Sequence, residues 1–516
     1  MSPQKHQQHD TANGASRLLR GDSLGTSMML LVGLVGLQRL IGLVRNVAFC
    51  RLLTDDQLGR WSLSYNFLLL AAPLVVFGVP GSFGRYVEHY RQRGQLRAFL
   101  RRTSMASLAA ALVAAAAFFA LPRAVAVLVY DDPSQVHSVR LLSVVLVSVV
   151  AFNFLIELLT ALRLVRVVAL MQLASSMAFA LAGLGLLCCT RLAEHAAVMA
   201  FGAGYVVTTF LGLYVVWRVY RGLPGPESPL ASGLLWRKLL PFAAWIWVGN
   251  LIANLFAVSD QFLLKHFSRL PPEAADALVG QYYSSRVVPL LMAGVVSLLA
   301  SSLLPFLTED WEAGRADVAR KRINTSLKLF AVLLTAGGAA ALVAAPLLFQ
   351  GVLGGKYDAG LSVLPGTLTY CIWYSLYCVA YSYLLCVEKA WLGSLSLLAG
   401  LAVSVVLNIL LAPRLGLPGV VWAAMAANAC ALGLVYHFSH RAGMTWDRGV
   451  WLASLLPLTL CLGGWAALAV LVAVLIGGWP AGWVFDNGEA QRAQQAAVIW
   501  CSRILRAAEE HPRVSP

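Results

Sequence analysis

Apolar residues occur along this chain in blocks of about twenty, separated by short polar segments. This is the length that an α-helix needs to cross the hydrocarbon core of a bilayer, about 20 residues. The pattern predicts an all-α polytopic membrane protein whose apolar blocks are its spans. The blocks cover 24–44, 62–84, 103–121, 139–161, 167–189, 196–217, 240–263, 280–307, 326–352, 361–386, 391–412, 417–437 and 451–477.

The first twelve blocks divide into two sets of six around a segment rich in Pro and Gly, 218–239, which we expect to be a cytoplasmic linker. Gly59 and Gly280 occupy similar places in the two sets, at an offset of 221 residues. Such an offset is typical of an internal repeat. Because each set holds an even number of spans, the sequence predicts two six-helix bundles, 24–217 and 240–437, as parallel repeats around a central cavity.

The remaining segments lie at the two ends of the chain. Residues 1–23 are polar and are expected to form a disordered cytoplasmic leader. Block 451–477 is long enough for one tilted span and too short for a helical hairpin, so it is predicted as an additional transmembrane helix. Residues 478–516 form an amphipathic tail whose side of the membrane stays open. Within the second block, Pro73 and Pro80 predict a bent or broken helix.

The net charge of +15 would suggest a nucleic-acid partner in a soluble protein. However, if the N-terminus is cytoplasmic, most Lys and Arg residues fall on the inner side, and loop 85–102 alone carries a cluster of arginines. This positive-inside pattern accounts for the basicity. We therefore expect no nucleic-acid partner, and a multi-pass protein of the cell inner (plasma) membrane with its N-terminus in the cytoplasm.

Arg39 lies well inside the first apolar block, where a cation costs about 2.5–3.5 kcal/mol on the insertion scale and usually has a function. Arg45 directly follows the same block. Arg286 lies at a similar predicted depth in block 280–307. One arginine from each half at the same level predicts a shared anion site. The alternative is that each arginine pairs with Asp260 or with backbone carbonyls.

One carboxylate also falls within a predicted span. Glu157 follows Asn153 by four residues and shares its helix face, about one turn from Arg163 and Arg166. It is either a partly solvated carboxylate paired with those arginines or a proton-coupling group. The fifth block, 167–189, carries little polarity and is expected to be a scaffold helix.

Enzyme motifs are missing from this sequence. It contains no phosphate-binding Gly loop followed by Lys, no nucleophile elbow and no zinc-ligand spacing among its nine cysteines. We expect a transporter without catalytic residues, metal or cofactor.

Several motifs in order resemble the polysaccharide flippases of the multidrug/oligosaccharidyl-lipid/polysaccharide exporter superfamily. They are RLIGLVRN with RLLTDDQLGRWSL, GVPGSFGRYV, VGQYYSSRVVP, GGKYDAG and NILLAPRLGLPG. The resemblance covers about 24–437 and implies two six-helix bundles that move lipid-linked sugars by alternating access. The pattern R-x-x-G-x-x-R-N and the YYSSR motif are also similar to those of lipid II flippases.

The resemblance implies a flippase that carries a prenyl diphosphate sugar from the inner to the outer leaflet for cell-surface polysaccharide biosynthesis. By that similarity Arg39, Arg45 and Arg286 would face the diphosphate. A polar lining for the sugar would come from Asn66, Asn153, Asn250, Asn254 and Tyr282, and Glu157 and Asp260 are candidate coupling or counter-ion residues.

The membrane potential or a proton or sodium gradient would supply energy. The expected partners are the lipid-linked sugar, membrane lipids, and a polysaccharide polymerase or glycosyltransferases. Three alternatives stay open: a lipid II flippase, a cation-coupled multidrug exporter of the same fold, and a membrane enzyme or scaffold of a polysaccharide pathway that transports nothing.

Overall fold

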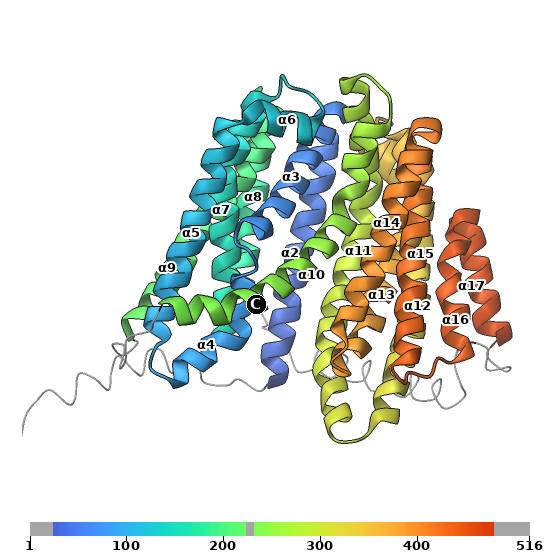
Figure 1. The fold of residues 1–516 in the computed structure, drawn as a ribbon. Coiled ribbons are helices and arrows are strands. Elements are labelled where there is room, and N and C mark those ends of the chain that lie inside the picture. Colours follow the sequence, from blue (N-terminus) through green and yellow to red (C-terminus); the bar gives the residue numbers. More distant parts are fainter. Residues whose placement is uncertain (1–23, 223–231, 479–483, 485–516) are drawn as a thin grey trace, which may run out of the picture.

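A computed structural model describes residues 24–222, 232–478 and Val484 of the chain (Figure 1). Within these ranges every regular element is a helix. Ten of the described helices are long and apolar enough to cross a membrane, or eleven if one bent pair counts as a span. The predicted all-α polytopic fold is confirmed. The leader 1–23 and the tail 478–516 lie outside the described residues, apart from Gly478 and Val484.

The first bundle forms the blue and green side of Figure 1. We call the end of the molecule where α2 ends its upper end, as it is drawn there. The elements of this bundle are α2 (Leu24–Leu52), α3 (Asp55–Val75), the 3₁₀ turn η2 (Pro80–Ser82), α4 (Phe83–Gln92), α5 (Leu96–Ala120), α6 (Pro122–Tyr130), α7 (Val136–Ala161), α8 (Val165–Cys189) and α9 (Glu194–Gly222).

The second span of this bundle is broken, as the sequence predicted. The helices on either side of the break, α3 and η2–α4, are bent by 62°. Phe77 and Gly78 between them have φ angles of 47° and 68°. Gly78 also has no room for a side chain, because a Cβ there would overlap the carbonyl oxygen of Ala243. The close approach of α10 therefore fixes the position of the break.

The second bundle forms the other side of Figure 1. One of its helices, α11, spans about 60 Å at 1.5 Å per residue and runs the full height of the bundle. The elements are α10 (Ser232–Phe267), α11 (Pro272–Glu312), α12 (Ala316–Pro346), the π-helical turn η3 (Leu347–Val352), α13 (Asp358–Cys386), α14 (Ala390–Leu415) and α15 (Leu417–Arg441).

The connection between the bundles is shorter than the sequence suggested. Helix α9 continues to Gly222 and α10 begins at Ser232, so only 223–231 separates them within the predicted linker 218–239. The first part of α10 crosses the lower end of the first bundle before the helix rises (Figure 1). There Leu235 and Leu239 are buried in an apolar core shared with α4 and α5, which explains why this part of the linker is helical.

The C-terminal segment differs from the single tilted span predicted over 451–477. The structure divides it into α16 (Arg448–Leu455), the 3₁₀ turn η4 (Leu456–Leu462) and α17 (Gly464–Gly478). Gly463 at the break has a φ angle of 105°, a conformation that a helix cannot contain. The resulting short helices lie side by side next to α12 (Figure 1), and each is shorter than a usual span.

Candidate functional site: a cationic cavity between the bundles

A cavity of about 600 Å³ lies between the two bundles. Helices α2, α3, α7, α8 and α9 of the first bundle and α10 and α11 of the second contribute side chains to it. No carboxylate occurs among its described lining residues, so the three arginines make the cavity cationic. The polar lining residues are Gln38, Arg39, Arg45, Asn46, Tyr65, Asn66, Asn153, Gln172, Ser175, Ser176, Tyr205, Tyr283 and Arg286.

The structure brings Arg39 and Arg286 into one cavity, but they are staggered rather than level as predicted. The Arg39 guanidinium packs on α11 at Gly294, where an added Cβ would lie 2.9 Å from its Cζ. Gly294 follows Arg286 by two turns, about 12 Å along the helix. The two arginines therefore offer positive charge at successive depths of the cavity.

Arg45 is the α2 arginine that lies nearest the level of Arg286. Helices α2 and α11 run in opposite directions (Figure 1), and Arg39 lies level with Gly294. Arg45, six positions after Arg39, therefore lies level with position 288 of α11, two residues from Arg286. The Arg45 Cζ sits 4.0 Å from the centre of the Phe179 ring. Its Nε and Nη2 donate to Asn46 Oδ1 at 3.3 and 3.1 Å. These contacts fix the guanidinium at the cavity wall.

Arg286 is buried and only partly hydrogen-bonded. Its Nη2 donates to the carbonyl oxygen of Ala257 at 3.1 Å. Its buried Nε has no hydrogen-bond partner in the described part of the chain. Of the two partners in the alternative considered from the sequence, an ion pair with Asp260 is absent from the described structure, whereas the contact with the Ala257 carbonyl is a backbone pairing of the kind expected. Arg286 therefore keeps an unpaired donor in the wall of the cavity.

Asp260 and Tyr282 lie inside the second bundle instead of lining the cavity. Ser404 Oγ donates to Asp260 Oδ1 at 2.9 Å and Asn408 Nδ2 donates to the same atom at 3.4 Å. The Tyr282 hydroxyl donates to Asp260 Oδ2 at 3.3 Å and is 2.8 Å from the Tyr370 hydroxyl. The prediction that Tyr282 belongs to the polar lining is wrong, because its side chain is committed to this internal cluster.

The predicted polar residues divide between the cavity and other surroundings. Asn66 and Asn153 line the cavity, and Asn66 Nδ2 donates to Gln261 Oε1 at 2.6 Å. Asn250 and Asn254 do not line it; Asn254 Nδ2 donates to the Asn250 carbonyl oxygen at 2.9 Å.

Glu157 is exposed on α7 and also lies outside the lining. It forms no ion pair with a described residue, so the pairing with Arg163 or Arg166 considered from the sequence is not observed. The sequence suggested that Glu157 lies at the same polar site as Asn153, because the two residues are one helical turn apart. In the structure only Asn153 lines the cavity.

Helix α8 contributes three polar side chains that sequence reasoning missed, because its low polarity suggested a scaffold. Gln172, Ser175 and Ser176 all line the cavity. Their spacing places them on one face of the helix, and this clustering within an apolar block was the available signal.

The cavity is closed at the upper end and accessible further down. Trp61, Asn66 and Arg286 are buried, whereas Arg39 and Asn153 are exposed. Above the cavity α3 and α11 cross in direct contact, and two ion pairs support the crossing. Lys265 Nζ lies 2.6 Å from an Asp276 carboxylate oxygen. Arg60, from the first bundle, reaches the same carboxylate at 3.9 Å.

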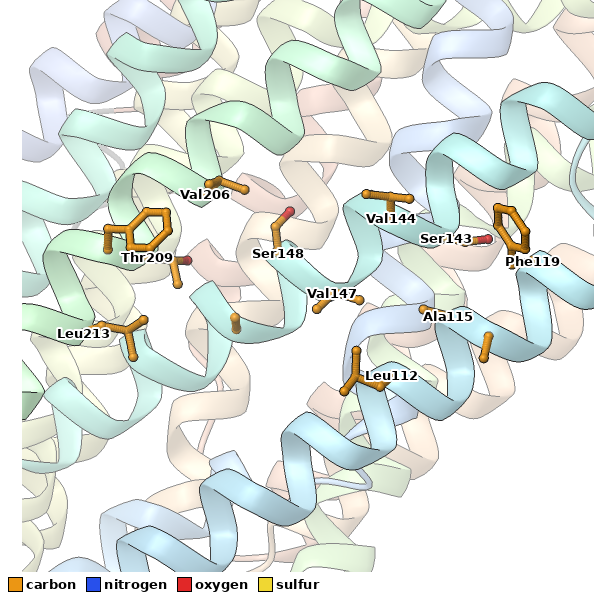
Figure 2. A pocket seen from close by; sticks show the side chains of 13 residues that line it. Leu112, Ala115, Phe119, Ser143, Val144, Val147, Ser148, Val206, Thr209 and Leu213 are labelled. Carbon is orange, nitrogen blue, oxygen red and sulfur yellow. The ribbon is translucent and has the colours of Figure 1, made fainter.

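A second hollow has the wrong chemistry for a charged ligand. It measures about 710 Å³ and lies between α5, α7 and α9. Figure 2 shows that apolar side chains such as Leu112, Val147 and Leu213 dominate it, with hydroxyls only at Ser143, Ser148 and Thr209. No charged residue lines it in the described structure. Its exposed apolar rim suits contact with lipid, so the smaller central cavity is the candidate functional site.

A known protein family matches more than half of this chain. The family described as polysaccharide biosynthesis protein matches residues 24–311. An uncharacterized membrane protein, YabM of Bacillus subtilis, is 28% identical over 232 residues, which cover 43% of this chain and 42% of that protein. The chain thus matches about two fifths of that relative's length.

Several solved structures share the fold. The lipid II flippase MurJ in an inward closed conformation aligns with 88% of this chain and 98% of its own, with a TM-score of 0.66 and 13% identity. An outward-facing multidrug resistance MATE transporter aligns with 83% and 97%, with a TM-score of 0.59 and 14% identity. At these identities the likeness concerns the fold alone.

Proposed function

The chain belongs to the polysaccharide biosynthesis protein family, and from this premise we propose that it is a flippase for a lipid-linked oligosaccharide. The cargo is a prenyl diphosphate sugar, which moves from the inner to the outer leaflet for cell-surface polysaccharide biosynthesis. The site of action is the cell inner (plasma) membrane. A polysaccharide polymerase or glycosyltransferases would use or supply the cargo.

The observation that carries this proposal is the set of three arginines in a cavity without a described carboxylate. A guanidinium presents planar pairs of donors that match phosphate oxygens. Arg286 has an unpaired buried donor, Arg45 lies near the same level, and Arg39 lies about two turns further down the cavity. A diphosphate would pair with Arg45 and Arg286, while the prenyl tail stays in the lipid.

Two of the alternatives fit this cavity less well. A multidrug exporter for cations needs acidic groups at its binding site, because like charges repel in a low-dielectric cavity. A membrane enzyme needs positioned acids, bases or a metal, and the described residues contain no group of three or more His, Cys, Asp or Glu able to hold a metal.

Lipid II is the second candidate cargo, since it contains the same prenyl diphosphate. The cationic cavity suits both lipids, and the attached sugar is what distinguishes them. The shared fold with MurJ favours testing lipid II directly.

The described state would receive cargo from the inner leaflet. Its cavity is closed at the upper end, and Arg39 and Asn153 are exposed lower down. If the N-terminus is cytoplasmic, the lower end faces the cytoplasm. Release outside then requires α3 and α11 to separate. A ligand drives this change only if its affinity differs between the two states. Such a difference would arise if the arginines change their relative positions when the bundles tilt.

The test is transport in proteoliposomes that contain a fluorescent undecaprenyl diphosphate oligosaccharide or fluorescent lipid II. We expect the wild type to move one of these lipids and the Arg39→Ala/Arg286→Ala double variant to lose at least tenfold in rate. Arg414→Ala is the matched control, because Arg414 is an exposed arginine at the end of α14. Equal transport by the double variant and the wild type would refute the arginine mechanism. A folded wild type that moves neither lipid would favour the scaffold alternative.

A further inference from the structure

One wall of the cavity is built of aromatic side chains. Six of them come from the first bundle and one, Tyr283, from α11 of the second. We call this set the aromatic wall; it consists of Trp61, Tyr65, Phe152, Phe179, Phe201, Tyr205 and Tyr283. Such a density of rings is unexpected in a cavity that otherwise presents arginines, amides and hydroxyls.

The six rings from the first bundle pack on one another in a continuous chain. The Phe152 and Tyr205 rings are stacked with centroids 4.4 Å apart and planes at 20°. Phe201 lies 4.6 Å from Tyr205 and 5.4 Å from Tyr65. Trp61 continues the chain at 5.6 Å from Tyr65. Because each of the six rings from the first bundle has a ring neighbour, this part of the surface is preformed and needs little ordering when a ligand binds.

The wall is divided into a buried support and an accessible surface. Trp61, Phe179 and Phe201 are buried, while Tyr65 and Tyr205 are partly exposed to the cavity. The hydroxyls of these two tyrosines have no hydrogen-bond partner among the described residues. The accessible part of the wall thus offers apolar ring faces together with unpaired hydroxyls.

The anion-binding groups adjoin this surface directly. The Arg45 guanidinium lies 4.0 Å from the ring centre of Phe179, and Phe179 is 5.3 Å from Phe201 in the middle of the wall. A phosphate held by Arg45 would therefore place the next group of its ligand against Tyr65 and Tyr205.

We propose that the aromatic wall binds the first sugar ring of the cargo, next to the diphosphate held by Arg45. This rests on the proposed function. A pyranose carries hydroxyls around its rim and C–H groups on its faces, and these faces pack on the negative face of an aromatic ring. Its hydroxyls would pair with those of Tyr65 and Tyr205. A cationic aromatic-binding drug is excluded from the same place by the charge of Arg45.

The wall therefore takes the role of sugar lining that the sequence assigned to Asn250, Asn254 and Tyr282. It would select cargo by its sugar, whereas the arginines respond to any prenyl diphosphate. Lipid carriers that have already released their sugar would bind more weakly and would not compete with loaded cargo.

The experiment compares two probes on the full-length protein in nanodiscs: a short-chain prenyl diphosphate, and the same lipid carrying glucose, galactose or N-acetylglucosamine. We expect the wild type to bind at least one sugar-bearing probe about tenfold more tightly than the sugar-free probe. The Tyr65→Leu/Tyr205→Leu variant should lose this difference and keep its affinity for the sugar-free lipid. Tyr65→Phe/Tyr205→Phe, which retains the rings, should keep most of the difference.

Tyr214→Leu is the matched control, because Tyr214 lies on α9 with Tyr205 but is 49% exposed outside the cavity. The inference is overturned if no sugar improves binding to the wild type, or if the Leu variant loses affinity for both probes equally. Thermal unfolding reports on folding, and the single Tyr205→Leu variant decides the question if the double variant does not fold. Failure of the proposed function is a separate result: the wild type binds neither probe, or Arg45→Gln/Arg286→Gln binds the sugar-free lipid as the wild type does.

Discussion

Gly59 of α3 and Gly280 of α11 face each other so closely that neither position has room for a side chain. A Cβ at Gly59 would overlap the carbonyl oxygen of Asp276, and a Cβ at Gly280 would overlap that of Asp55. Each added Cβ would also lie 3.1 Å from the amide nitrogen of the opposite glycine. The contact is reciprocal, and both residue pairs are related by the 221-residue offset seen in the sequence. It joins the two bundles directly above the cavity.

Substitution of Gly59 by Ala should destabilise the state that is closed at the upper end. The added methyl has no space, and overpacking of this kind costs about 1–3 kcal/mol. Spin labels at positions 51 and 269 measure the separation of the bundles at the upper end by double electron–electron resonance. We expect Gly59→Ala to increase the fraction of molecules in which the distance between the two labels is longer. Gly185→Ala is the control, since a Cβ there meets nothing within 4 Å. An unchanged distance distribution in Gly59→Ala would show that α3 and α11 accommodate the added methyl group without opening the upper end.

Substitution of Gly294 by Leu should weaken anion binding without removing a charge. The new side chain would occupy the place of the Arg39 guanidinium, whose Cζ is 2.9 Å from an added Cβ. We expect the Kd for a short-chain prenyl diphosphate to rise roughly tenfold, or ~1.4 kcal/mol. In the Arg39→Ala background the same substitution should have little further effect, because the displaced group is already gone. Gly433→Leu serves as the control, because a Cβ at Gly433 meets nothing within 4 Å. If the effects of Gly294→Leu and Arg39→Ala on the Kd are fully additive, the two residues are not coupled and the prediction is wrong.

Loss of Lys265 should destabilise the protein strongly. Lys265 and Asp276 are 3% and 4% exposed and form an ion pair of 2.6 Å, so Lys265→Met leaves a buried carboxylate with only the more distant Arg60. Breaking a buried pair costs about 3–5 kcal/mol. The Lys265→Met/Asp276→Leu double variant should recover most of this loss, which a double-mutant cycle of unfolding in detergent would measure. A double variant no more stable than Lys265→Met would count against the pair.

The Asp260→Asn variant should show whether Asp260 and its hydrogen-bond partners in the second bundle only stabilise the structure or also couple transport to an ion gradient. The amide keeps an oxygen for Ser404, and its NH₂ can donate to the Tyr282 hydroxyl, so stability should change by less than about 1–2 kcal/mol. If Asp260 couples transport to a proton or sodium gradient, flipping in proteoliposomes should lose its response to an imposed gradient. Glu157→Gln is the comparison, because Glu157 was the other coupling candidate; loss of the response in that variant alone would assign coupling to Glu157.

The break after α3 was predicted from the sequence, while the C-terminal break was not. Pro73, Gly78 and Pro80 occur together in the first case, and local backbone chemistry was enough. The pair Gly463–Gly464 was the available signal in the second case, but the apolar composition continues on both sides, and the packing of α16 and α17 against α12 showed two short helices where length suggested one span.

The apolar blocks alone determined that this protein is a helical membrane protein, because a bilayer leaves backbone groups no partners outside helices and closed barrels. They also located the arginines that line the cavity. The tertiary structure decided which side chains share the cavity. Tyr282 and Tyr283 are neighbours in the chain, yet about 100° apart around α11, so one serves the Asp260 cluster and the other the aromatic wall. Likewise, Arg45 and not Arg39 lies nearest the level of Arg286. The register between α2 and α11 is set by their packing and cannot be derived from the sequence of either helix.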